Sequence, residues 1–167
     1  IDQFGYYTIA ATVAIGLLQI VYPLVQAVLP QAVGLRADPS ALRSLCFKLT
    51  GAIGLLTGGV ALVFYGVGAG LLELWLRDSQ AVAVVYPLLS ILLVGTGLNA
   101  FYNVGYIHWL VHGAVRRVWQ VNLLALLLAV ALIPPLVTWQ GTRGAAFGWL
   151  AINGIGFLLS LEWLKRT

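Results

Sequence analysis

The chain has little charge, no methionine and a single cysteine. Charged residues make up 8% of its 167 residues, whereas a soluble domain carries about 25%. Hydrophobic residues make up 61%, so lipid rather than water is the expected solvent of the folded chain. Because methionine is missing even at position 1, we expect the chain to be a piece of a longer protein. Cys46 has no second cysteine to pair with, which excludes an internal disulfide.

Acidic residues are absent from the middle of every apolar run. The five that exist flank the runs: Asp2, Asp38, Glu73, Asp78 and Glu162. Proton relays and acid–base catalysis depend on carboxylates held inside a site, and the sequence has no phosphate-binding loop or catalytic-triad motif. We therefore expect no enzymatic activity and no cofactor. The net charge of +4 is spread over short connections and forms no basic face, which argues against a nucleic-acid partner.

Five uncharged runs have lengths that suit membrane-spanning helices, which need about 20 residues. They cover residues 3–35, 49–72, 79–115, 118–142 and 144–161. The run 79–115 could hold one span or two. As one span, it places Arg77 and Arg143 on one side and seven basic residues on the other: Arg36, Arg43, Lys48, Arg116, Arg117, Lys165 and Arg166. Two spans would divide the nine five to four. Because Lys and Arg concentrate in cytoplasmic loops, we choose one span, beginning near Pro87.

The prediction is an all-α, polytopic transmembrane helix bundle of five spans, forming a single unit over residues 1–167. The charge division places the N-terminus outside and the C-terminus in the cytoplasm. Asp38 followed by Pro39 predicts a helix cap and first turn. We expect a short amphipathic helix over residues 36–48 on the cytoplasmic surface, near anionic lipid headgroups. A solvated loop that only fixes topology is the alternative.

Two of the predicted spans carry a stripe of polar side chains along one face. In the first span, the stripe lies within about 80° of helix surface and comprises Thr8, Thr12, Gln19, Tyr22 and Gln26. In the third, spacings of three and four residues align Asn99, Tyr102, Asn103 and Tyr106. Such stripes suit helices that line a hydrated or sugar-accommodating cavity, since amides and aromatic rings are common partners of sugars. The alternative is that they only hydrogen-bond between helices.

Basic and imidazole groups gather at the cytoplasmic end of the third span. Arg116 and Arg117 could bind a phosphate of the cytoplasmic leaflet, or could serve only to fix topology. His108 and His112 have a spacing that can bind a metal, but no neighbouring carboxylate or cysteine completes a site. We therefore expect no metal.

Four segments, taken in order, resemble a family. The segments are FGYYTIAATVAIGLLQIVYPLVQAVLPQ, LLELWLRD, ILLVGTGLNAFYNVGYIHWLVHG and GTRGAAFGWLAIN. Together they resemble the bacterial polysaccharide (O-antigen) flippases, members of the multidrug, oligosaccharidyl-lipid and polysaccharide exporter superfamily. Gly105 departs from the pattern, because the family often has proline there.

The resemblance implies a transporter of about twelve helices in two lobes, which rock to give alternating access. This chain would supply helices eight to twelve, and its partners would be membrane lipid and the missing N-terminal half of the same protein. The cargo would be a polyprenyl-diphosphate-linked oligosaccharide, flipped across the bacterial inner membrane for polysaccharide or lipopolysaccharide biosynthesis. Arg116 and Arg117 would lie near the diphosphate. The residues that would face the sugar are Gln19, Tyr22, Gln26, Asn99, Tyr102, Asn103 and Tyr106.

Other functions remain open from the sequence. A peptidoglycan-precursor or multidrug transporter of the same superfamily fits the same pattern. A membrane glycosyltransferase would need catalytic groups on an outer loop, and these loops are too short. A scaffold subunit that transports nothing would use the polar stripes to pair its helices.

Overall fold

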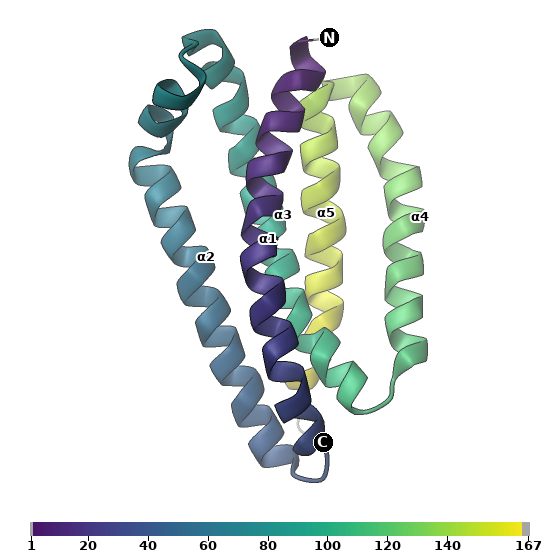
Figure 1. The fold of residues 1–167 in the computed structure, drawn as a ribbon. Helices are drawn as coiled ribbons and strands as arrows, with labels where there is room; N and C mark the ends of the chain where they lie inside the picture. The colour runs from purple at the N-terminus through teal and green to yellow at the C-terminus, as the bar shows by residue number, and fades with distance from the viewer. Residues whose placement is uncertain (1, 165–167) are drawn as a thin grey trace.

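The computed structural model describes residues 2–164, which fold into long antiparallel helices (Figure 1). The helices are α1 (Asp2–Gly34), α2 (Pro39–Leu76), α3 (Ser79–Val111), α4 (Val115–Gln140), α5 (Thr142–Ser160) and the short 3₁₀ helix η1 (Leu161–Leu164). All five α-helices are long and apolar enough to cross a membrane. The prediction of an all-α bundle with five helices of membrane-spanning length is thereby confirmed for the described residues.

The run that could hold one span or two forms the single helix α3. It begins at Ser79, so the predicted start near Pro87 was wrong, and Pro87 lies inside the helix. The Asp78 carboxylate caps the helix, accepting hydrogen bonds from the Gln80 and Ala81 amides at 2.9 and 3.1 Å. Such a cap satisfies amide groups that the first turn leaves without partners.

The second helix is longer than predicted. Asp38 caps α2 as expected, and Pro39 is its first residue. The prediction of a separate amphipathic helix over 36–48 was wrong, because residues 39–48 continue without a break into the long apolar part of α2. Leu42 and Cys46 are buried in the same cluster as Ile53 further along the helix. The first turns therefore pack against the bundle and do not lie apart on a membrane surface.

Replacing Asp38 by alanine is expected to loosen the first turn of α2. The Asp38 side chain accepts from the Ala41 amide at 3.0 Å and from the Ser40 hydroxyl at 2.8 Å, and these bonds lower the pKa of the Asp38 carboxyl. The stabilisation is therefore complete above the ordinary carboxyl pKa, about 3.8, and is lost as the pH falls through the lower folded value. Hydrogen exchange of the Ala41 amide should be several-fold faster in Asp38→Ala. The Asp38→Asn variant keeps an acceptor, so its exchange should stay slow; equal exchange in wild type and Asp38→Ala would contradict the cap.

The core of the bundle lies around α3. This helix packs against α1, α2 and α5, whereas α4 packs mainly against α5. In its most apolar stretch, 44% of α3 is buried but only 6% of α4. One buried cluster joins Val21 of α1, Ile53 of α2 and Ile107 of α3. Helix α3 is therefore the central helix of the bundle, against which α1, α2 and α5 pack.

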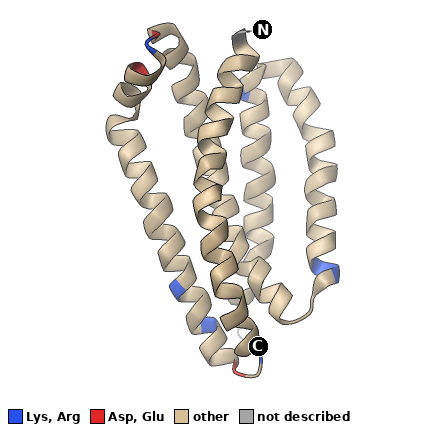
Figure 2. Ribbon diagram, in the orientation of Figure 1, with Lys and Arg blue, Asp and Glu red and all other residues tan. Residues whose placement is uncertain are grey.

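Basic residues gather at one end of the bundle (Figure 2). This end carries the α1–α2 and α3–α4 connections, with Arg36 in the first and Arg116 and Arg117 just after the second. At the opposite end, Arg77 lies in the α2–α3 connection and Arg143 in the first turn of α5. Lys165 and Arg166, which the predicted charge division also used, lie outside the described residues. The described basic residues therefore divide as the single-span arrangement requires.

Candidate functional site

The polar stripe of α1 lies on the surface of the bundle. Gln19, Tyr22 and Gln26 are all exposed, and Tyr22 shows 40% of its surface. The opposite side of the same helix is buried against α3, with Val21 fully enclosed. Thr12 turns its hydroxyl back to the Thr8 carbonyl at 2.8 Å, which satisfies it within the helix. The amides of this stripe, by contrast, face outward from the described chain.

The polar stripe of α3, unlike that of α1, lies beside another helix of the bundle, α5. Asn99 donates from Nδ2 to Oδ1 of Asn153 on α5, at 2.6 Å. Asn103 is only 8% exposed and donates to the Asn99 backbone carbonyl at 2.8 Å. Asn153 in turn donates to the Trp149 carbonyl at 2.8 Å. The Asn99 amide therefore joins α3 to α5, whereas the Asn103 amide is satisfied within α3.

The two tyrosines of the α3 stripe, Tyr102 and Tyr106, lie among aromatic rings near the same interface. The ring centroids of Tyr102 and Tyr106 are 6.1 Å apart, and those of Tyr102 and Trp109 are 6.0 Å apart. Both tyrosines are half-buried. Among the described residues, the buried hydroxyl of Tyr102 has no hydrogen-bond partner.

The two predicted stripes therefore differ in their surroundings. The stripe of α1 is open, and that of α3 is engaged with α5. Asn153 was visible in the sequence as a polar residue of the fifth span, but spacing along one helix cannot identify a partner 54 positions away. Whether any of these side chains touch a sugar stays a prediction.

The two arginines that follow α3, Arg116 and Arg117, also differ in their surroundings. Arg117 forms an ion pair with Glu162 of η1, and Trp109 of α3 donates from Nε1 to the other Glu162 oxygen at 3.2 Å. Arg116 is exposed. Glu162 therefore links α3, α4 and η1, a role that sequence reasoning missed because this residue was read only as a charge at the end of a span. Of the two arginines predicted to bind a phosphate, Arg116 is the more accessible, because Arg117 is paired with Glu162.

The two histidines lie at the end of α3 that precedes the α3–α4 connection. The ring centroids of His108 and His112 are 4.3 Å apart, and His112 Nδ1 lies 2.8 Å from the His108 carbonyl oxygen. Within residues 2–164, no group of three His, Cys, Asp or Glu side chains could hold a metal ion.

Comparison of the chain with models of protein families, with curated proteins and with solved structures gives no match.

Proposed function

We propose that the chain is the C-terminal part of a membrane flippase, supplying its helices eight to twelve. The cargo is a polyprenyl-diphosphate-linked oligosaccharide, translocated across the bacterial inner membrane for polysaccharide biosynthesis. The basic end of the bundle is cytoplasmic, because Lys and Arg concentrate on that side. The face of α1 that carries Gln19, Tyr22 and Gln26 lines the sugar path, and Arg116 lies near the incoming diphosphate.

The observation that carries this proposal is the exposed stripe of α1. Gln19, Tyr22 and Gln26 place two amides and a phenol on the surface in the middle of α1, whereas its other exposed amides, Gln3 and Gln31, lie near its ends. An amide moved from water into hydrocarbon without a partner loses roughly 4–8 kcal/mol, so this face is unsuited to acyl chains. It requires water, a sugar or another protein surface. A hydrated path for an oligosaccharide meets that requirement, since sugar hydroxyls both donate to and accept from amides.

A scaffold role for the chain is the second candidate, and the α3–α5 interface favours it. Asn99 already pairs with Asn153, which is how polar side chains join helices in a membrane. In that case the α1 stripe would pair with a partner helix in the same way. The two candidates differ in whether water reaches Gln19 and Gln26.

The test is complementation of a bacterial strain that lacks its own oligosaccharide flippase. The protein at its natural length is expressed with Gln19→Leu and Gln26→Leu together, and transport of the lipid-linked oligosaccharide is measured. Loss of at least ten-fold is expected, because leucine removes the hydrogen-bonding groups of the path. The matched control is Gln31→Leu on the same helix, which is also exposed but lies outside the stripe, and it should transport normally.

A second readout separates the two candidates. Single cysteines at positions 19 and 26 should react with a water-soluble maleimide in membranes if the stripe lines a hydrated path. Wild-type transport in the folded double variant, or thiols that do not react, would overturn the proposal.

A further inference from the structure

The six tryptophans of the chain divide into an enclosed and an exposed group. Trp109 and Trp163 are buried, and among the described residues the indoles of Trp109 and Trp149 donate to side chains of the bundle. The exposed group is Trp75, Trp119 and Trp139, whose surfaces are 60%, 63% and 77% open. The N–H groups of these three indoles are therefore available to acceptors outside the described chain.

The exposed tryptophans all lie close to helix ends. Trp75 and Trp139 are each the last residue but one of their helices, α2 and α4, at the end of the bundle that carries Arg77. Trp119 lies near the start of α4, at the opposite, basic end, three residues after the exposed Arg116. Tryptophan is enriched at membrane–water interfaces, because its ring suits the apolar side and its N–H the headgroup side.

The spacing of the two tryptophans on α4 matches a bilayer. Trp139 follows Trp119 by 20 residues, about 30 Å at about 1.5 Å per residue, and the hydrocarbon core of a bilayer is about 30 Å thick. Residues 123–137, between them, are leucine, alanine, valine, isoleucine and proline throughout. In its most apolar stretch only 6% of α4 is buried, so this apolar surface is open along its whole length.

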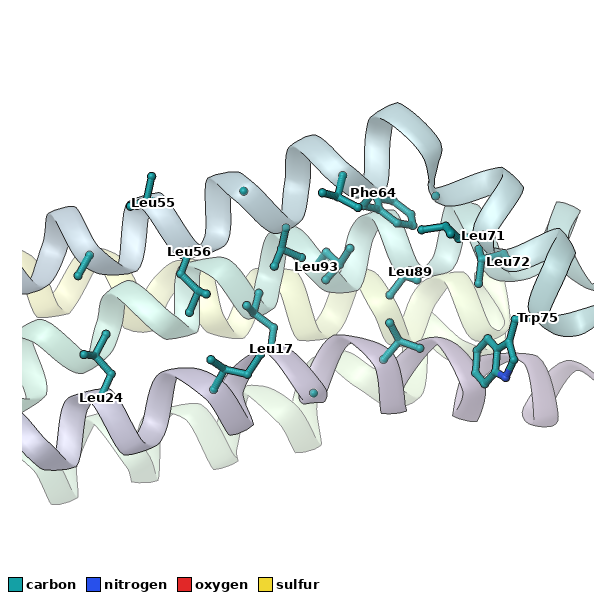
Figure 3. A pocket seen from close by; sticks show the side chains of 18 residues that line it. Leu17, Leu24, Leu55, Leu56, Phe64, Leu71, Leu72, Trp75, Leu89 and Leu93 are labelled. Carbon is teal, nitrogen blue, oxygen red and sulfur yellow. The ribbon is translucent and has the colours of Figure 1, made fainter.

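Trp75 ends a second open apolar surface, at the α2 edge of the bundle. It lies at one end of a pocket of about 1130 Å³ between α1 and α2, as Figure 3 shows. Every other lining residue is glycine, alanine, an aliphatic residue or Phe64, and Leu55, further along α2, is 82% exposed. An indole donor followed by apolar surface is also the order in which a lipid presents its headgroup and its acyl chain.

We propose that Trp75, Trp119 and Trp139 mark the two membrane–water interfaces, and that the outward face of α4 between them contacts lipid acyl chains. The indole N–H groups donate to ester and phosphate oxygens of the lipids, and Arg116 lies beyond the inner level, among anionic headgroups. A protein partner would cover the apolar middle of α4 equally well, but it would not require tryptophans one bilayer thickness apart. The inference concerns lipid contact alone, so it holds for a flippase and for a scaffold.

The test is fluorescence quenching by brominated phosphatidylcholine in vesicles that contain the protein at its natural length. The bromines are placed either high in the acyl chain, near the glycerol, or close to its end. Each of Trp75→Phe, Trp119→Phe and Trp139→Phe should remove emission that the shallow bromines quench more strongly than the deep ones. The matched controls are Trp109→Phe and Trp163→Phe, which should remove only emission that neither lipid quenches, because these rings are buried.

A tryptophan added at the middle of α4 gives the second arm. Val130 is 67% exposed and lies about midway between Trp119 and Trp139, so the emission gained in Val130→Trp should be quenched most by the deep bromines. Unquenched emission from this position would show that protein covers α4 and would overturn the inference. Equal quenching of the exposed and the control tryptophans would also overturn it. Neither readout depends on transport, so a flippase assay that fails leaves this result intact.

Discussion

Replacing Gly105 by alanine is expected to destabilise the bundle by about 3 kcal/mol, the upper end of the usual cost of overpacking. A Cβ at this position would lie 2.2 Å from the backbone oxygen of Ser160 and 2.6 Å from its Cβ. The obstacle is backbone at the end of α5, and no side-chain rotation can relieve it. Helix α3 and helix α5 must therefore move apart.

The control for Gly105 is Gly97→Ala on the same helix. A Cβ there meets nothing within 4 Å, and alanine favours a helix over glycine by up to about 1 kcal/mol. Gly97→Ala should therefore be neutral or slightly stabilising. Thermal or denaturant unfolding in detergent measures both variants, and equal midpoints for the two would show that α3 and α5 do not pack as described.

Replacing Gly144 by alanine should have an effect at least as large, at the other end of α5. A Cβ there would lie 1.9 Å from the carbonyl oxygen of Leu136 and 2.3 Å from its carbonyl carbon. Gly144 is also fixed from its other side, because its amide donates to the Gly141 carbonyl at 3.0 Å. The last turn of α4 and the first turn of α5 cannot both keep their positions, so a loss of about 3 kcal/mol or more is expected.

The effect at Gly144 should appear locally as well as in global stability. Limited proteolysis should cut the α4–α5 connection near residues 140–143 faster in Gly144→Ala than in wild type. Gly154→Ala, further along α5, is the matched control, since a Cβ there makes only an ordinary contact of 3.8 Å with Leu98. Cleavage of Gly144→Ala at the rate of this control would refute the close approach of α4 and α5.

Part of the α3–α5 interface was open to prediction and part was not. The stripe of Asn99, Tyr102, Asn103 and Tyr106 follows from helical spacing alone, and α3 carries it as predicted. This stripe meets α5 because Gly105 permits a close approach of the two helices. The sequence does not show the importance of this glycine, because it depends on Ser160, 55 positions later. Helical periodicity describes one helix at a time, so it cannot select the neighbour.

The sequence by itself determined the features that depend on neighbouring residues. Apolar runs predicted five helices long enough to cross a bilayer, which needs about 20 apolar residues per crossing. Asp38 predicted a cap because its side chain reaches the amide three residues away. The tertiary structure alone decided which polar face is open and which is paired, and it joined Arg117 to Glu162. The physical reason is that all helix faces of similar polarity look alike in sequence, and only the fit of side chains across an interface distinguishes them.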